Sequence, residues 1–211
     1  MAPDDPPPPG GTASPRSLGA GYFDDLYGRT PDGDPWHFAS SPYEAAKYAA
    51  TLAELPRARY RSALEVGCSI GVFTGQLAGR VDRLLAVDLV AGALARASER
   101  CAGLPHCQFA RVDLAERVPA GPFDLITLAE VAYYWTPALF ARIFAALVAE
   151  LADSGQIILV HWRAPVPDYP QDGDEVHRSA HALAAGLGLV PRREVVTDRY
   201  RLDLWERPAE G

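Results

Sequence analysis

The chain has 211 residues, 48% of them hydrophobic and 22% charged, which fits one globular domain with a sizeable core. Its net charge of −7 argues against a dedicated nucleic-acid-binding protein, and no apolar run is long enough to span a membrane. The three cysteines form no CxxC pair. We therefore expect a cytoplasmic monomer or homodimer with reduced thiols and no metal, nucleic-acid or membrane partner.

The first sixty residues divide into two predicted segments. Residues 1–20 are acidic and proline-rich, lack the basic start and apolar core of a secretory signal, and are predicted to be a disordered tail. Residues 21–60 are predicted to form a helical cap over the main domain. In this cap an aromatic, acidic stretch broken by prolines precedes a helix that begins near Pro42 and stops before Pro56.

Short apolar runs alternate with helical stretches over residues 61–208, which form the predicted core domain. Strands that are apolar on both faces and separated by helices indicate a parallel sheet covered on both sides. The final stretch alternates apolar and polar residues around Thr197 and Asp198, which is typical of an antiparallel hairpin at a sheet edge. The predicted strands are 63–66, 84–88, 107–112, 123–129 and 156–162, and the predicted helices are 71–80, 91–102, 137–152 and 173–186.

The first strand leads into a turn that contains two glycines, within L-E-V-G-C-S-I-G at residues 64–71. A dinucleotide-binding loop would read G-x-G-x-x-G, whereas here serine replaces the second glycine and the third glycine comes one residue early. A phosphate-binding P-loop would continue with Gly-Lys-Ser/Thr, which does not follow. Neither kind of phosphate loop fits this turn.

Acidic residues lie at the ends of three consecutive predicted strands: Glu65, Asp88 and Asp113. Open α/β sheets bind ligands at the carboxyl ends of their strands. There Asp88 can accept both hydroxyls of a ribose, and Asp113 can accept an adenine amino group. Glu65, beside the turn, would repel a pyrophosphate but suits an ammonium or sulfonium group. Alone, each acid could be an ordinary strand-end, helix-cap or turn residue; together they favour S-adenosylmethionine.

These motifs and others along the chain resemble a class I S-adenosylmethionine-dependent methyltransferase over about residues 43–207, and more narrowly the NodS-like family of nodulation N-methyltransferases. The matching segments are Y-F-D-D-L-Y, D-P-W-H-F, Y-E-A-A-K-Y, L-E-V-G-C-S-I-G, L-A-E-V-A-Y-Y and H-W-R-A-P-V-P-D-Y-P-Q-D-G-D-E-V-H. The resemblance implies an α/β, Rossmann-like, seven-stranded and mostly parallel sheet with helices on both faces and an antiparallel C-terminal hairpin.

The resemblance also implies S-adenosylmethionine as the methyl donor and S-adenosylhomocysteine as the product, without a metal. Tyr43 and Lys47 lie one turn apart on the helix before the sheet, where Lys47 could meet the methionine carboxylate; an exposed lysine is the alternative. The full predicted set of cofactor-binding residues is Glu65, Gly67, Cys68, Ser69, Gly71, Asp88, Leu89, Asp113, Leu114, Glu130, Tyr43 and Lys47.

Two residues at adjacent strand ends are the candidates for catalysis. Methyl transfer requires an aligned nucleophile and the exclusion of water, and an amine must arrive neutral. Glu130 follows the fourth strand and is predicted to orient the acceptor. His161 ends the fifth strand and is predicted to act as a base or hydrogen-bond partner. The alternatives are a carboxylate that caps the turn over 131–136 and a histidine buried beneath the following helix.

Aromatic side chains are predicted to wall the acceptor pocket, where they would suit sugar rings and cationic amines; the alternative is a place in the core. The predicted substrate-binding residues are Tyr22, Trp36, Tyr133, Tyr134 and Trp162.

The acceptor is predicted to be a small molecule. The segment after the fourth strand reads A-E-V-A-Y-Y, unlike the Asn/Asp-Pro-Pro-Tyr motif of enzymes that methylate nucleic-acid bases, and the chain has no asparagine for a magnesium-dependent catechol site. The resemblance implies N-methylation of an amino sugar or amine-bearing natural product. O-methylation of a small metabolite, and a nucleotide- or NAD-binding domain without methyl transfer, stay open as alternatives.

Overall fold

The computed structural model describes residues 16–209, which build one seven-stranded sheet in the order β3-β2-β1-β4-β5-β7-β6. Strands β1 to β5 pair in parallel, and β7 pairs antiparallel with both β5 and β6, so the predicted fold class and edge hairpin are confirmed. The strands are β1 (Ala63–Val66), β2 (Leu84–Asp88), β3 (Cys107–Arg111), β4 (Phe123–Ala129), β5 (Leu151–Trp162), β6 (Val190–Val196) and β7 (Tyr200–Glu206).

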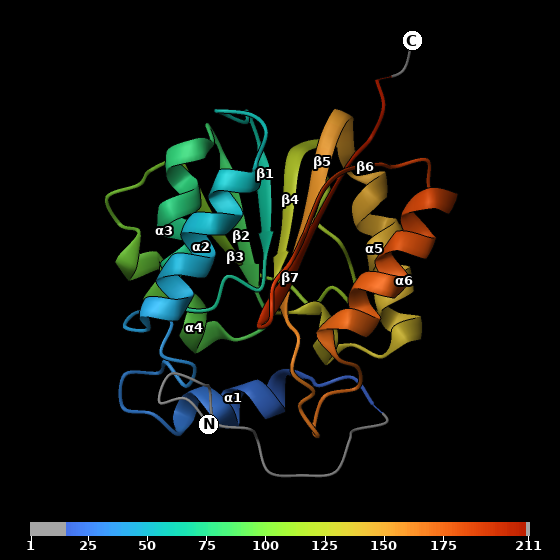
Figure 1. Ribbon diagram of the computed structural model, residues 1–211. Coiled ribbons are helices and arrows are strands. Elements are labelled where there is room, and N and C mark those ends of the chain that lie inside the picture. The colour runs from blue at the N-terminus through green and yellow to red at the C-terminus, as the bar shows by residue number, and fades with distance from the viewer. Residues whose placement is uncertain (1–15, 210–211) are drawn as a thin grey trace.

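Helices cover both faces of the sheet, and one helix crosses its end (Figure 1). On one face lie α2 (Pro42–Glu54), α3 (Val72–Leu77) and α4 (Ala91–Arg100), and on the other lie α5 (Pro137–Ala149) and α6 (Gly173–Gly186). In Figure 1, α1 (Ala20–Gly28) lies beyond the carboxyl end of β1. Two short 3-10 helices follow α3 and β4, namely η1 (Ala78–Arg80) and η2 (Ala132–Tyr134).

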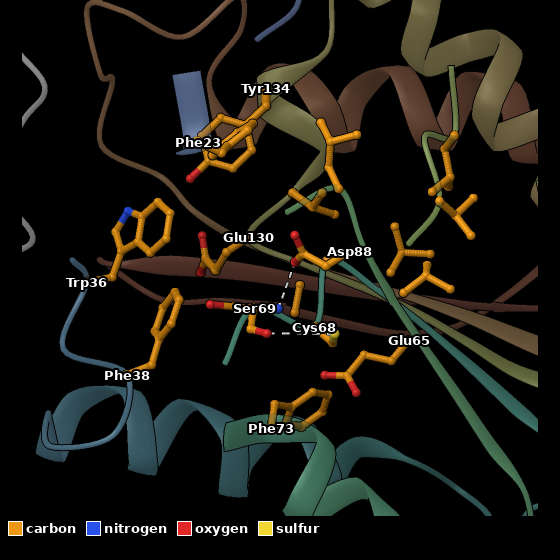
Figure 2. A pocket seen from close by; sticks show the side chains of 18 of the residues that line it. Phe23, Trp36, Phe38, Glu65, Cys68, Ser69, Phe73, Asp88, Glu130 and Tyr134 are labelled. Carbon is orange, nitrogen blue, oxygen red and sulfur yellow. Dashed lines mark hydrogen bonds between the residues drawn. The ribbon is translucent and has the colours of Figure 1, made fainter. Parts of the chain in front are cut away.

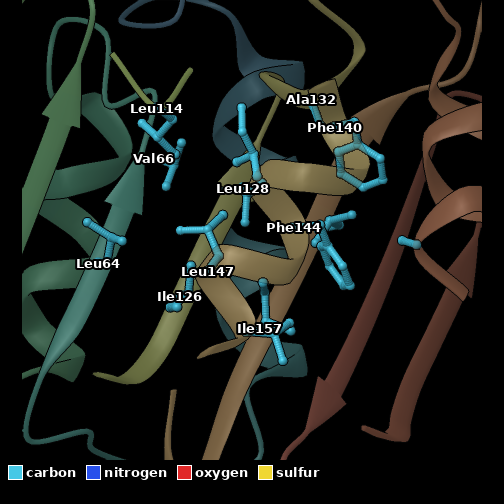
Figure 3. Packing of buried hydrophobic residues seen from close by; sticks show 14 of the residues in the cluster. Leu64, Val66, Leu114, Ile126, Leu128, Ala132, Phe140, Phe144, Leu147 and Ile157 are labelled. Carbon is cyan, nitrogen blue, oxygen red and sulfur yellow. The ribbon is translucent and has the colours of Figure 1, made fainter. Parts of the chain in front are cut away.

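The larger part of the core lies between the sheet and α5 (Figure 3). Phe140, Phe144 and Leu147 of α5 are fully buried and pack toward Ile126 and Leu128 of β4. Burial of a side chain of this kind contributes about 1.5–3 kcal/mol. These side chains therefore hold α5 against the sheet.

Some element boundaries and the burial of an outer strand differ from the sequence prediction. The helix expected over 137–152 ends at Ala149, because Leu151 already pairs with Phe123 and begins β5 ahead of a register shift in that pair. The strand β3 is also less buried than expected, because it is an edge strand of the sheet, whereas the largely exposed β6 fits the predicted edge hairpin.

The N-terminal segment joins the fold earlier than its composition suggested. Residues 1–15 of the expected disordered tail lie outside the described residues. The Ser17 Oγ accepts a hydrogen bond from the amide of Thr136 at 2.9 Å, and the Leu18 amide donates to the carbonyl of Tyr134 at 2.9 Å. Over residues 16–209, none of the helices has both the length and the apolar character needed to cross a membrane.

Candidate functional site

A pocket opens at the carboxyl ends of β1, β2 and β4, where the order of the strands reverses between β1 and β4 (Figure 2). It encloses about 1000 Å³, including its opening to solvent, which is large enough for a nucleoside-sized ligand. The predicted site residues that line it are Glu65, Gly67, Cys68, Ser69, Asp88, Leu89, Asp113, Leu114, Glu130, Trp36 and Tyr134.

The turn after β1 is held in a left-handed conformation at three positions. Gly67, Ser69 and Gly71 have φ values of 73°, 50° and 79°. At Gly71 an added Cβ would lie 2.8 Å from the Cα of Ala97, so glycine here lets α4 pack against the turn. Gly71 thus shapes the turn without lining the pocket.

Ser69 is the residue of the turn that is fixed by long-range hydrogen bonds. Its amide donates to Asp88 Oδ2 at 2.8 Å, as Figure 2 shows, and its Oγ accepts a hydrogen bond from the Tyr27 hydroxyl at 2.6 Å. Tyr27 lies on α1 and also lines the pocket. These bonds connect the turn both to the end of β2 and to the helix that crosses the strand ends.

The two acids nearest the turn are buried. Glu65 is 3% exposed, and its Oε2 has no hydrogen-bond partner among the described residues. Burial raises the pKa of Glu65 to about 8. Burial also raises the pKa of Asp88, although that carboxylate accepts hydrogen bonds from the amides of Ser69 and Val90. Glu65 therefore offers the pocket a buried carboxyl oxygen without a partner, whereas Asp88 offers a buried carboxyl group held by two amides.

Asp113 and Cys68, two further residues that were predicted to contact the cofactor, also line the pocket. The carboxylate of Asp113 accepts a hydrogen bond from the amide of Ala115 at 2.8 Å, which is the turn role considered as its alternative. The Cys68 thiol is buried, and burial raises its pKa well above the usual range, so it lies in the pocket as a neutral thiol.

Glu130 lies at the end of β4 with a φ of 56° and its carboxylate is held from three sides. Oε1 accepts from Lys47 Nζ at 2.6 Å, and Oε2 accepts from the Tyr133 hydroxyl at 2.5 Å and from the Trp162 amide at 3.0 Å. Three donors from three elements thus fix the orientation of the carboxylate beside the pocket.

Lys47 does not line the pocket and is not exposed; it is 2% exposed and pairs with Glu44 at 2.9 Å as well as with Glu130. Although burial opposes its charge, the two carboxylates raise the pKa of Lys47 above its usual value. Tyr43, one turn earlier, also lies outside the lining, with the Arg199 guanidinium 3.7 Å from the centre of its ring. The structure therefore places Lys47 as the counter-ion of Glu130.

His161 lies behind the pocket, fully buried and outside its lining. Its Nε2 accepts a hydrogen bond from the Ala132 amide at 3.1 Å, and its Nδ1 lies 3.1 Å from His177 Nε2. Burial lowers the pKa of His161 well below its usual value. The structure thus places this histidine beneath α6, which is the alternative considered from the sequence.

Of the five aromatic residues that were predicted to bind substrate, two line the pocket and three lie outside its lining. Trp36 and Tyr134 line the pocket, whereas Tyr22, Tyr133 and Trp162 do not. Figure 2 shows Trp36 and Phe38 side by side at one edge of the pocket and Phe23 close to Tyr134. The lining residues that sequence reasoning missed include Phe23, Tyr27, Phe38, Tyr48 and Trp135. The family segments were the signal that could have found them, since Phe23, Tyr27, Phe38 and Tyr48 lie within three of these segments and Trp135 directly follows a fourth.

One group of possible metal ligands exists among residues 16–209, formed by His181, Glu194 and Asp203. The Arg201 guanidinium lies among them and contacts Glu194 at 2.7 Å, Asp203 at 2.8 Å and His181 at 3.0 Å. A cationic side chain thus already occupies the position that a metal ion would take.

Comparison with known proteins places this architecture in a family. The family described as Nodulation protein S (NodS) matches residues 24–168, which is more than half of the chain. Nodulation protein S of Sinorhizobium fredii is 34% identical over 127 residues, which cover 59% of each chain. The chain therefore spans less than two thirds of the length of this curated relative.

Solved structures share this fold. The N-methyltransferase NodS from Bradyrhizobium japonicum WM9, in complex with S-adenosyl-L-homocysteine, has a TM-score of 0.78 and 23% identity, over 90% of this chain and 98% of that one. A Pseudomonas syringae protein for which methyltransferase activity has been proposed has a TM-score of 0.68 and 36% identity, over 78% of this chain and 99% of that one. The resemblance seen in the motifs is confirmed: the chain belongs to the Nodulation protein S (NodS) family.

Proposed function

We propose that the chain is an S-adenosylmethionine-dependent methyltransferase that methylates an amine of a small molecule, most narrowly an amino sugar or amine-bearing natural product. One observation carries the proposal: a single pocket joins three strand-end acids, the left-handed turn and the fixed carboxylate of Glu130. Family membership supports it, since the related NodS from Bradyrhizobium japonicum is an N-methyltransferase with bound S-adenosylhomocysteine.

The residues present fit the cofactor. The unpartnered Oε2 of Glu65 is a buried acceptor that an ammonium group would satisfy. Each carboxylate oxygen of Asp88 accepts one backbone amide and keeps a lone pair for a ribose hydroxyl. The turn itself is less suited to a pyrophosphate, because the carboxylate of Asp88 would place negative charge beside it. These features favour a methyl donor over NAD.

When bound, S-adenosylmethionine supplies a methyl group on a cationic sulfur, which a neutral amine can attack in line. Glu130 would orient that amine. Its Oε2 already accepts from Tyr133 and Trp162, so the remaining lone pair on Oε1, beside the bond from Lys47, is the acceptor position left for an N–H of the substrate. Such a hydrogen bond directs the amine lone pair away from the carboxylate.

The aromatic wall would exclude water from the reacting atoms and contact the acceptor. Trp36 and Phe38 are stacked, with ring centroids 5.3 Å apart, and Tyr134 lies with Phe23 in an edge contact at 4.8 Å. Rings of this kind pack against sugar faces and attract the cationic form of a methylated amine. The combination of aromatic rings with one carboxylate supports an amine more than a hydroxyl as the acceptor.

Calorimetric titration tests the cofactor. We expect S-adenosylhomocysteine to bind more tightly than NAD, and Asp88→Ala to weaken that binding by about 1–3 kcal/mol through the loss of hydrogen bonds to a charged acceptor. Tighter binding of NAD would refute the methyltransferase proposal, and unchanged affinity in the variant would remove Asp88 from the cofactor site.

Transfer of a radiolabelled methyl group tests the acceptor. Amino sugars with a free amine should be labelled, whereas their N-acetylated forms, which differ only in that amine, should not. Glu130→Gln should retain affinity for S-adenosylhomocysteine yet lower turnover. Labelling of the N-acetylated forms at a hydroxyl would replace N-methylation by O-methylation.

A further inference from the structure

The segment over residues 130–135 forms one wall of the pocket, with four of its residues in the lining: Glu130, Val131, Tyr134 and Trp135. This wall contains the short 3-10 helix η2 and no strand, so the sheet alone does not fix its shape. It is held from behind by buried side chains. Gln171 Nε2 donates to the carbonyls of Ala132 and Trp135, at 3.3 Å and 2.9 Å.

The second attachment of the wall is a chain of two histidines whose protons can be assigned. The Ala132 amide can only donate, so His161 Nε2 must carry a lone pair, and the proton of a neutral His161 lies on Nδ1. That proton points to His177 Nε2, which must then accept, and the proton of His177 also lies on Nδ1. His177 Nδ1 in turn donates to Asp203 Oδ2. The position of the proton on His161 therefore determines the position of the proton on His177.

Burial and packing support this assignment. His161, His177 and Asp203 are all 0% exposed, and burial lowers the pKa of both histidines. Burial alone would raise the pKa of Asp203, but the bond from His177 and the charge of Arg201 lower it. The series of hydrogen bonds that starts at Ala132 therefore ends on a carboxylate. An added Cβ at Gly173 would lie 2.1 Å from the carbonyl oxygen of Trp162, so glycine there lets α6 approach closely enough to place His177 under His161.

We propose that His161, His177 and Asp203 form a positioning chain that sets the backbone of the 130–135 wall, so that β7 and α6 determine where Glu130 and Tyr134 face the pocket. His161 acts through the Ala132 amide and is a positioning residue, not the base that its place at a strand end suggested. Its nitrogens are both used within the protein. The effect on catalysis rests on the function proposed above, whereas the proton positions do not.

Nuclear magnetic resonance of the full chain, labelled with ¹⁵N, tests the proton positions without any substrate. Long-range ¹H–¹⁵N correlations should show both histidines as the neutral Nδ1–H tautomer, with the signals assigned from His161→Gln and His177→Gln. An Nε2–H tautomer or an imidazolium at His161 near neutral pH would overturn the proposal, because either form leaves no acceptor for the Ala132 amide.

Paired substitutions test the effect on the wall. In His161→Gln the side-chain amide can still accept from Ala132 and donate to His177, whereas His161→Leu can do neither. We expect His161→Gln to stay within about threefold of the wild-type kcat, and His161→Leu to lose about 10- to 100-fold, as a displacement of about 1 Å can cause. Affinity for S-adenosylhomocysteine should change little in either variant. His177→Gln and His177→Leu form a second pair if His161→Leu does not fold.

The control is Leu204→Ala, a fully buried substitution on the opposite face of β7 from Asp203, with activity corrected for the folded fraction. Activity in His161→Gln as low as in His161→Leu would mean that the imidazole itself is needed, and an undiminished kcat in His161→Leu would mean that the chain does not position the wall. Failure of the wild-type protein to methylate any acceptor would refute the proposed function and leave the resonance test of the chain in place.

Discussion

The raised pKa of Glu65 leads to a prediction about stability. Glu65→Gln replaces the buried carboxyl by an amide of the same shape that does not titrate. The unfolded chain releases the Glu65 proton near the ordinary value of 4.5, whereas the folded chain retains it up to about pH 8. The unfolded state thus binds fewer protons between these values, so the carboxyl makes the folded state less stable as the pH rises.

The size of the effect follows from the pKa difference. From pH 5 to pH 7 the unfolded state gains roughly 2–3 kcal/mol from the ionisation of Glu65, at 1.36 kcal/mol per pH unit, while the folded state gains almost nothing. Removal of the carboxyl should therefore stabilise the ligand-free protein by roughly 2–3 kcal/mol more at pH 7 than at pH 5. At about 2–4 °C per kcal/mol for a chain of this size, the increase in Tm caused by Glu65→Gln should be larger at pH 7 than at pH 5 by roughly 4–12 °C.

Thermal and urea unfolding of the ligand-free wild type and Glu65→Gln, at pH 5, 6 and 7, measures this difference. Glu116→Gln is the control, because Glu116 is exposed and its substitution should shift both transitions little at any pH. A stability difference between Glu65→Gln and the wild type that is the same at pH 5 and pH 7 would refute the reasoning, since it would mean that Glu65 ionises alike in both states.

Two further predictions concern the contacts that hold the pocket. Lys47→Met leaves Glu130 and Glu44 without their buried counter-ion and should lower the free energy of unfolding by about 3–5 kcal/mol, measured in urea. The double variant Lys47→Met with Glu44→Gln should recover part of this loss. A Lys47→Met variant as stable as the wild type would contradict the pairing. Tyr27→Phe removes the bond to Ser69 and should weaken S-adenosylhomocysteine binding by about 2- to 10-fold in calorimetry; equal affinities would show that this bond does not support the turn.

The sequence predicted the parts of the molecule that depend on local pattern. Apolar runs alternating with helical stretches located the parallel strands, and the acids at their ends identified the pocket edge, because parallel strands bring their carboxyl ends together. Glu65 and Asp88 lie in the pocket for that reason. The family segments then favoured S-adenosylmethionine as the ligand at the turn after β1.

Contacts between distant segments could not be predicted in the same way. A lysine on an amphipathic helix is usually exposed, and only the fold shows that Lys47 meets Glu130 across the pocket edge. A histidine at a strand end can face the pocket or the layer behind it, and packing of α6 decided this for His161. Tyr27 lies in the matching segment Y-F-D-D-L-Y, but its bond to Ser69 depends on how α1 crosses the strand ends, which the segment alone does not predict.

The pairing of Lys47 with Glu130 also sets a limit on how far the chain can be shortened. The segment over 61–208 contains every strand of the sheet and resembles a self-sufficient unit. A fragment that begins there would nevertheless keep the acid at the end of β4 and discard the ammonium group that neutralises it, along with the helix that shields both. The smallest working fragment must therefore start ahead of Pro42, because the charge balance of the pocket is supplied from outside the sheet domain.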